Sequence, residues 1–474
     1  MFAHNGPATD GDSMATIAQR SLFSWKQIDA ASDLDRLRLV LSVLPDEPLV
    51  ATLEKQRGRG RDDYPIRPTW NALLAGIVFQ HPSAAALLRE LGRNAELREL
   101  CGYDPLRGTG AVPTEDAFGR FLALVVAQGD KLRAIFDALV DELSRELPDL
   151  GRRLAVDSKA IQSAGKPVRD EDKRTEPDGR RDLDADWGTK TYNGLRADGS
   201  AWEKVTHWFG YKLHLLVDST YELPLGLKLT QASASDTPEL LPLVSEFEDK
   251  HEQAAQRAEQ LAADKAYDSG QVKGDLYDDH QIKPVIDHRQ LWKENPGKPR
   301  VLFGDRVDVV LYDEMGRVYC QPPTERRGAD EVREMAFVGF EKDRLALKYR
   351  CPAAFYGFEC QGRAECEKLA SSGVGEFGRT VRVPLDLDRR IFTPIARSTP
   401  KWKRAYDRRT ALERVNSRID RVLGFEQHFI RGKAKMEARV TLGLIVLLAM
   451  ALGRIRAKQP KLMRSLTAPV RRAA

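Results

Sequence analysis

Two aspartates stand at the ends of short apolar runs in this chain of 474 residues. Asp157 follows Leu154–Val156, and Asp264 follows Leu261–Ala263. Runs of this length and composition predict buried strands. Because side chains at strand ends of an α/β sheet face a shared crevice, we expect the two carboxylates to lie near one another.

A third acid, Glu413, lies in a basic stretch that is expected to be helical. Tyr406, Arg409 and Glu413 follow one another at spacings of three and four residues, which place their side chains on one helical face. Alone, a glutamate in a basic helix would be interpreted as an ion-pair partner. Together with Asp157 and Asp264 it completes a set of three carboxylates.

Three carboxylates in one pocket suit a particular chemistry. Mg²⁺ prefers oxygen ligands and keeps several of its waters. Two such ions held about 4 Å apart can activate an attacking hydroxyl and stabilise the leaving oxygen of a phosphoryl transfer. We therefore predict that Asp157, Asp264 and Glu413 are catalytic and bind two Mg²⁺ ions, for which Mn²⁺ can substitute.

The charge distribution favours nucleic acid as the partner. The whole chain carries a net charge of +5, but the segment from Arg389 to Ala474 holds 22 Lys and Arg against five Asp and Glu. Clustered basic side chains neutralise phosphates, so this segment predicts a DNA-binding surface. Charge alone leaves open the alternative of a merely solvated basic face.

The rest of the pattern divides the chain into regions. Apolar residues three or four apart predict helices from Trp25 to Leu147, where strand signals are absent. The polar stretch from Ala164 to Ser200 is predicted to be a loop. Further elements are expected at Trp208–Val217 and Leu223–Thr230 (strands), from Thr237 to about Gln260 (helix), and from Lys401 to about Arg456 (helix).

These elements predict six consecutive segments, in chain order a disordered N-terminus at 1–20, a helical N-terminal domain at 21–150, the first part of a catalytic core at 151–269, an insertion with strands and cysteines at 270–395, a second, helical part of the core at 396–456, and a basic tail at 457–474. The helical domain has two open interpretations. It is either a DNA-end-binding or dimerising unit, or a helical cap on the domain that follows.

With these residues identified, the sequence resembles the DDE transposases of bacterial insertion sequences, in the branch with an RNase H-like domain and a Tyr-x2-Arg-x3-Glu-x6-Lys signature. Tyr406, Arg409 and Glu413 match that signature, and the segments around Asp157 and Asp264 are similar to the family's other two blocks. The resemblance covers about residues 40–455. It implies an α/β fold with an RNase H-like mixed sheet flanked by helices, an N-terminal all-helical domain, and a β-rich insertion before the last catalytic acid.

The resemblance also implies an activity and its partners. DNA strands would be cleaved and transferred at the terminal inverted repeats of an insertion sequence by two-metal phosphoryl transfer. The partners would be double-stranded DNA, at the transposon ends and the target, and a second copy of the chain in a homodimer. A catalytically inactive DNA-binding copy that represses its element is the alternative, and a host nuclease built on the same sheet is a third.

Several basic residues are expected to contact the DNA. The resemblance assigns Tyr406 and Arg409 to the region near the scissile end. The signature's Lys position, seven residues after Glu413, is Asp420 here, so Arg418 or Arg421 is expected to take its place. Lys212, on an expected strand, is a further candidate, although a surface lysine in contact with solvent is the simpler interpretation.

The cysteines form a separate pattern. Cys320, Cys351, Cys360 and Cys366 are four of only five in the chain, and four thiolates can hold a tetrahedral Zn²⁺. No Cys-x2-Cys pair occurs among them, so free buried thiols are the simpler interpretation. Five cysteines in a chain of this length do not make a disulfide scaffold, which favours a reducing cytoplasm.

Two further observations bear on localisation. Residues 1–20 lack the apolar core of a signal peptide. The most apolar stretch, Val440–Leu452, is 13 residues long, whereas a membrane-spanning helix needs about 20. We therefore predict a buried helix there, no membrane association, and a bacterial cytoplasmic protein that associates with the nucleoid.

Overall fold

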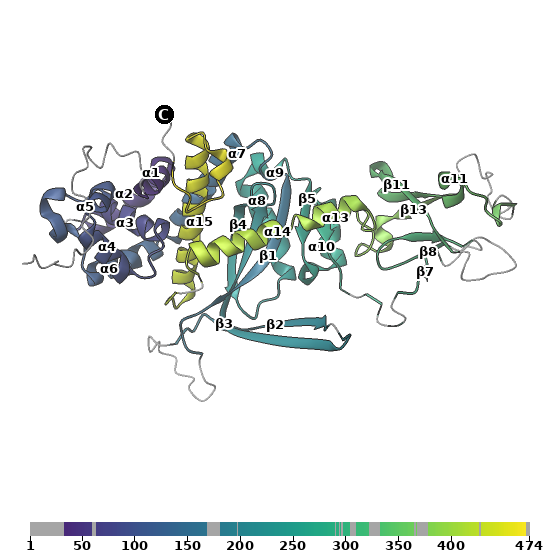
Figure 1. The fold of residues 1–474 in the computed structure, drawn as a ribbon, viewed down its shortest axis with the longest axis horizontal. Coiled ribbons are helices and arrows are strands. Elements are labelled where there is room, and N and C mark those ends of the chain that lie inside the picture. Colours follow the sequence, from purple (N-terminus) through teal and green to yellow (C-terminus); the bar gives the residue numbers. More distant parts are fainter. Residues whose placement is uncertain are drawn as a thin grey trace, which may run out of the picture.

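The computed structural model describes most of the chain after residue 32. The described residues are 33–58, 63–167, 181–196, 198–289, 291–292, 294, 297–303, 310–321, 332–364, 366, 378–425 and 428–470. The predicted disordered segment 1–20 therefore lies outside them. Arranged along the long axis of the molecule are an N-terminal group of helices, a central sheet, and a smaller β-rich region (Figure 1).

All regular structure described before residue 153 is helical, as the apolar spacing predicted. The helices are α1 (Leu34–Val43), α2 (Glu47–Arg57), α3 (Ile66–Val78), α4 (Ala84–Arg93), α5 (Ala95–Cys101), the 3₁₀ turn η1 (Pro105–Ala111), α6 (Glu115–Val126) and α7 (Gly129–Glu146). Local capping explains several starts. Thr114, for example, accepts a hydrogen bond from the Ala117 N–H and begins α6 where the sequence indicated a helix start.

The central sheet has the mixed strand order expected of an RNase H-like fold. Its strands are β1 (Arg153–Gln162), β2 (Asp186–Leu195), β3 (Ala201–Asp218), β4 (Leu223–Gln231), β5 (Gln260–Ala263) and β6 (Lys283–Ile286). The second half of β3 lies between β4 and β1, antiparallel to both. The strands β5 and β6 then continue the sheet in parallel with β1.

The sheet is connected and covered by short and long helices. These are the turn η2 (Thr237–Glu239), α8 (Leu240–Lys250), α9 (Glu252–Ala255), the turn η3 (Lys265–Tyr267) and α10 (Gly270–Asp278). The single helix predicted from Thr237 to about Gln260 is thus wrong in its extent. It is interrupted at His251 and ends at Ala255, and Gln260 already begins β5.

The loop predicted for Ala164–Ser200 is corrected in its second half. Residues 186–195 form β2, which pairs with the first half of β3 as a two-stranded ribbon that extends away from the sheet (Figure 1). Two glycines conceal this strand from sequence patterns. A Cβ at Gly188 would lie 2.4 Å from the Trp208 ring, and one at Gly194 would lie 2.7 Å from the Trp202 ring.

The β-rich region follows β6. One small sheet contains β7 (Arg300–Val301), β8 (Val310–Tyr312), β9 (Val318–Cys320) and β10 (Arg333–Glu334), and the other contains β11 (Ala336–Glu341), β12 (Ala346–Arg350) and β13 (Thr380–Pro384). The turns η5 (Lys342–Arg344) and η6 (Leu385–Leu387) and the helix α11 (Pro352–Tyr356) complete it. The predicted start of the insertion at residue 270 is wrong, because β6 is a strand of the central sheet and α10 packs against β6.

The C-terminal part is helical but not continuous. It contains α13 (Pro400–Asp407), α14 (Thr410–Ser417), the π turn η7 (Arg418–Val422), α15 (Lys433–Arg456) and the turn η8 (Pro460–Leu462). The helix predicted from Lys401 to Arg456 is broken at two places. Gly424 and Gly432, both at positive φ, occur in the second break, before α15.

The helix α15 is the centre of the main hydrophobic core. By length and composition it could cross a membrane, but 89% of its apolar window is buried by the rest of the protein. It packs against α1, α3, α7 and β4. The buried side chains of the helical region and of the sheet therefore form one continuous core.

Residues 457–470, the described part of the predicted basic tail, pack against the main hydrophobic core. Leu466 and Val470 are buried, and the Arg36 guanidinium donates a hydrogen bond to the Leu466 carbonyl. This part of the chain therefore packs back onto α1.

Candidate functional site

Asp157 and Asp264 lie side by side at one edge of the sheet. The strands β1 and β5 are parallel neighbours, with Val156 opposite Ala263, so the two aspartates follow directly after paired residues. Asp264 also caps η3, because its Oδ1 accepts a 2.7 Å hydrogen bond from the Ala266 N–H. Asp264 directly follows β5, as predicted. The predicted strand end at Asp157 is wrong, because β1 continues through Asp157 to Gln162 and pairs with β3 along that length.

The electrostatics of Asp157 reflect this proximity. Its side chain is 20% exposed. Burial and the neighbouring charge of Asp264 raise the pKa of Asp157 to about 6, against the opposing effects of the Ser158 N–H and of Arg409 and Lys190. A buried aspartate whose ionisation is disfavoured by its neighbour's charge marks a place where positive charge is stabilising.

Glu413 is connected to the two aspartates by Arg409, which contacts both Glu413 and Asp157. It lies on α14, which packs against β1 and β3. Arg409 Nη2 is 3.1 Å from Glu413 Oε1, and its Nη1 is 3.8 Å from Asp157 Oδ2. Burial lowers the pKa of Arg409, but Tyr406 and the acids around it outweigh burial and leave it raised. Arg409 thus connects the outer acid, whose side chain is 58% exposed, to the inner pair.

The donor set of this edge suits a hard cation, although the side chains are not yet grouped around one. Carboxylate oxygens are the ligands that Mg²⁺ prefers. In the part of the chain that the structure describes, no group of three or more His, Cys, Asp or Glu side chains is already arranged to hold a metal ion. At the carboxylate edge, the guanidinium of Arg409 lies between Asp157 and Glu413.

A series of stacked side chains leads to Arg409 along α13. Tyr406 stacks on Trp402 with ring centroids 4.9 Å apart and planes 10° apart. The guanidinium of Arg409 lies 5.8 Å from the Tyr406 ring, and that of Arg397 lies 4.5 Å from the Trp402 ring. Arg397 in turn pairs with Asp287, at the end of β6. Sequence reasoning missed Trp402 and Arg397, although the spacing of Trp402, Tyr406 and Arg409 is helical.

The predicted DNA contacts differ in their availability. Arg421 is exposed. Arg418 is largely buried and pairs with Glu222 at 2.5 Å. The Lys212 ammonium donates to the Ala234 carbonyl at 2.7 Å and to Asp236 at 3.1 Å, so it does not extend into solvent as the simpler interpretation held.

Asp420, at the signature's Lys position, has a partner on β1. Its carboxylate lies 2.5 Å from the Lys159 ammonium. Because Lys159 is two residues beyond Asp157 on the same strand, the two side chains share one face of the sheet. The lysine that the signature places on the helix is therefore matched here by a lysine on the strand, paired with the acid at the helix position.

Glu222 was not singled out from the sequence. It lies in the turn before β4 with φ +58° and is buried. Its carboxylate accepts hydrogen bonds from Arg414 at 2.6 Å, from Arg418 at 2.5 Å and from Arg464 at 3.2 Å. Since Arg414 and Arg418 lie at the end of α14, Glu222 attaches the helix that carries Glu413 to the sheet.

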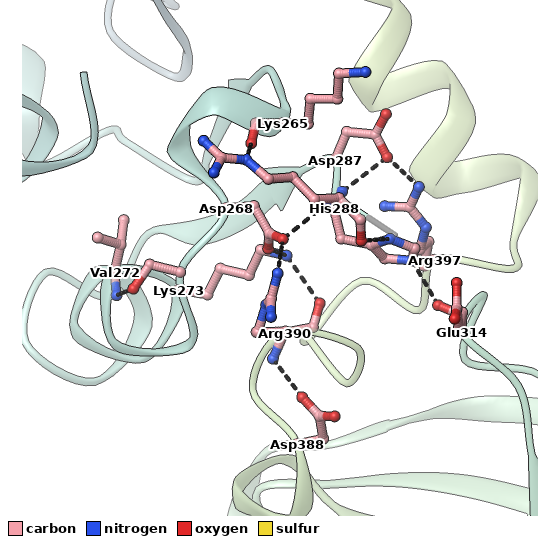
Figure 2. Close-up of polar contacts among 12 residues, drawn as sticks. Lys265, Asp268, Val272, Lys273, Asp287, His288, Glu314, Asp388, Arg390 and Arg397 are labelled. Atoms are coloured by element: carbon pink, nitrogen blue, oxygen red, sulfur yellow. Dashed lines mark hydrogen bonds and ion pairs between the residues drawn. The ribbon is translucent and has the colours of Figure 1, made fainter. Parts of the chain in front are cut away.

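The segment after Asp264 is held by a buried ionic network, which Figure 2 shows. Asp268 is fully buried and accepts from Lys273 at 2.9 Å, from the Arg289 N–H at 3.0 Å, and from Arg390. Burial raises the pKa of Asp268, but the two cations outweigh it and leave the pKa lowered. Arg390 belongs to the chain that returns from the β-rich region, so this network joins that region to the Asp264 segment.

The four cysteines of the β-rich region also come together. Cys320, Cys351, Cys360 and Cys366 line a single cavity, and Cys101 is buried in the main core instead.

With this geometry established, the comparison with known families is informative. Residues 149–449 match the family described as Transposase DDE domain. The match covers well over half of the chain, from just before β1 into α15, and includes Asp157, Asp264 and Glu413. A comparison with curated proteins found no match.

The chain therefore belongs to the transposase DDE domain family. It is a DNA-acting enzyme of transposition and DNA recombination, built on a mixed α/β RNase H-like fold with an N-terminal helical region. Members of this family generally use divalent metal ions.

Proposed function

We propose that this transposase cleaves and transfers DNA strands at the terminal inverted repeats of a bacterial insertion sequence, with Asp157, Asp264 and Glu413 as the catalytic acids. The observation that carries the proposal is the placement of the two aspartates on paired strands, with Arg409 between Asp157 and Glu413. Asp157 and Asp264 lie on neighbouring parallel strands, and Arg409 bridges Asp157 to Glu413. Burial and the charge of Asp264 disfavour the ionisation of Asp157 by raising its pKa, so a cation beside the two aspartates would be stabilising.

The acids would hold two Mg²⁺ ions, or Mn²⁺ in their place. Bound there, the ions would supply Lewis acidity for in-line attack on a phosphodiester, first by water and then by the freed 3′ hydroxyl. Asp157 and Asp264 are fixed by their strands and would set the inner ligand positions. Glu413 is more exposed and would close the site from the helix side, and Arg409 would turn away from the acids toward the DNA.

The basic side chains divide into those that contact DNA and those that support the fold. Arg409 can form a bidentate clamp on a phosphate, and exposed Arg421 can contact the backbone. Tyr406 has one face covered by Trp402, so it would present its edge or its other face near the scissile end. We assign Arg418 and Lys212 to support rather than to DNA, because both are engaged within the protein.

The DNA partners would be the transposon ends and a target duplex, bridged by a homodimer in the bacterial cytoplasm at the nucleoid. One observation favours a second function, that of an inactive copy that binds its element and represses it. The signature's Lys position is Asp420, and the nearest lysine, Lys159, is neutralised by it.

Asp264→Asn tests both functions. The asparagine oxygen can still accept from the Ala266 N–H, so the local fold is retained while the charge is lost. With Mg²⁺ and duplexes that carry the element's inverted repeats, we expect cleavage to fall on the order of a thousand-fold. Gel-shift binding should be unchanged.

Asp343→Asn is the matched control, because this aspartate is exposed and lies on η5 in the β-rich region. It should cleave like the wild type. If the wild type binds the repeats and cleaves no strand with either metal, the repressor function replaces the catalytic one. If Asp264→Asn cleaves normally, the assignment of the acids is wrong.

A further inference from the structure

A cavity of about 390 Å³ in the β-rich region gathers four of the chain's five cysteines. They come from separate segments. Cys320 ends β9, Cys351 directly precedes α11, and Cys360 and Cys366 follow α11. Cysteine makes up about one residue in a hundred in this chain, so a single cavity that collects four of them indicates a common role.

The surroundings of the cavity favour thiolates. None of the five cysteines forms a disulfide. Arg363 and Arg379 line the same cavity, against the single acid Glu359, and a neighbouring guanidinium stabilises a thiolate. The cavity therefore brings four thiols and two guanidinium-bearing side chains together.

The position of the cavity gives it a structural role. Cys320 belongs to the sheet of β7–β10, whereas Cys351 follows β12 of the other small sheet. The buried core beneath these sheets is small, and small cores depend on disulfides or metals for stability. A crosslink among the four cysteines would join the two sheets to each other and to the segment that carries Cys360 and Cys366.

We propose that Cys320, Cys351, Cys360 and Cys366 bind one structural Zn²⁺ ion. Four thiolates are the tetrahedral donor set that zinc takes in structural sites, with Zn–S distances of about 2.3 Å. Among the described residues, no three potential ligands are already arranged around a metal ion. The four thiols must therefore rotate toward one another when they bind the zinc ion. Each thiol loses its proton to solvent, and the two arginines offset the charge of the tetrathiolate complex.

The measurement is the metal content of the full-length protein, purified without chelator. We expect about one zinc per chain, lost in Cys320→Ser, Cys351→Ser, Cys360→Ser and Cys366→Ser. Cys101→Ser is the matched control and should keep its zinc, because Cys101 lies in the main core. Replacement of the zinc by Co²⁺ should give the intense visible absorption of tetrahedral thiolate coordination.

A second measurement covers variants that fail to fold. Wild-type protein stripped of metal by a chelator should regain one equivalent on addition of ZnCl₂ and release protons as it does so. No zinc in the purified protein and no uptake of Zn²⁺ or Co²⁺ would overturn the proposal. So would iron with acid-labile sulfide, disulfides among the four cysteines, or zinc retained in the serine variants. None of these readouts depends on DNA cleavage, so the site stands or fails separately from the carboxylates.

Discussion

The helical region before β1 and the β-rich region after β6 are attached to the same sheet in different ways. Helices α1 to α7 share one hydrophobic core with the sheet through α15. The β-rich region has a core of its own, which Tyr277 of α10 joins. Further links to the sheet are the ion pairs of Asp268 with Arg390 and of Asp287 with Arg397.

The difference indicates how each region depends on the sheet. A shared apolar core forms or is lost as a unit, because each side buries the other's surface. A region with its own core, joined through ion pairs, can open locally while the rest stays folded. We therefore expect the helical region to be inseparable from the sheet and the β-rich region to be a separate unfolding unit.

The sharpest test is a matched pair of tryptophan truncations. Trp70 is buried in the main core and Trp292 in the core of the β-rich region. Each change to Ala should cost about 3–5 kcal/mol. Hydrogen exchange read by mass spectrometry should show protection lost in α3, α15 and β4 for Trp70→Ala, and only after residue 290 for Trp292→Ala. Loss of protection in β1 and β5 in the second variant would mean that the two cores unfold together.

The ionic junction should contribute nearly as much. Asp268→Asn leaves Lys273 and Arg390 without a counter-charge in a buried place, which typically costs about 3–5 kcal/mol. Asp278→Asn, at the end of α10, is the matched control, because Asp278 pairs with Arg389 in a more exposed setting and such pairs are worth about 1 kcal/mol or less. Equal losses in urea unfolding would show that the junction is not held by the buried network.

The smallest expected effect is a pH dependence at the junction of the helical region. His251 is buried and lies 2.8 Å from Asp141, with Asp137 and Lys250 nearby. Burial lowers its pKa, but the two aspartates outweigh burial and leave the pKa raised above 6.5. The stabilisation is therefore complete below pH 6.5 and is lost as the pH rises through the folded pKa.

We expect the free energy of unfolding to fall by about 1–2 kcal/mol across that range. The His251→Gln variant, which cannot titrate, should lack this fall when unfolding is followed by circular dichroism. A wild-type profile that rises above pH 6.5 would contradict the assignment of the charged histidine to this contact.

The sequence predicted the fold class and the segments that carry the three acids, but not all of the strands and their bounds. Asp157 and Asp264 were identifiable because each follows a short buried apolar run, which is a local pattern, although β1 continues past Asp157 to Gln162. Glu413 was identifiable from its helical spacing to Arg409. By contrast, β2 contains glycines opposite tryptophans instead of alternating apolar residues, and β6 is only four residues long and contains a proline. Both strands form because of their pairing partners, β3 for β2 and β5 for β6, and not because of a local sequence pattern.

The supporting contacts could not be predicted from one sequence. Asp420 and Lys159 are 261 residues apart, and Arg414 and Glu222 are 192 residues apart. No local signal marks either pair, because each depends on the folded arrangement of α14 on the sheet. The same holds for the cysteines, whose spacing lacks the pairs typical of zinc sites although they share one cavity.

The pairing of β1 with β5 restricts which insertions and deletions the coding sequence of β1 can tolerate. Successive side chains of a strand point to opposite faces, and Val156 is in register with Ala263. Loss or gain of one codon between Leu154 and Asp157 would turn the carboxylate of Asp157 toward the opposite side of the sheet, whereas a change of two codons would preserve its direction. Short insertions and deletions should accordingly be tolerated in the turns that flank this strand and excluded from the strand itself.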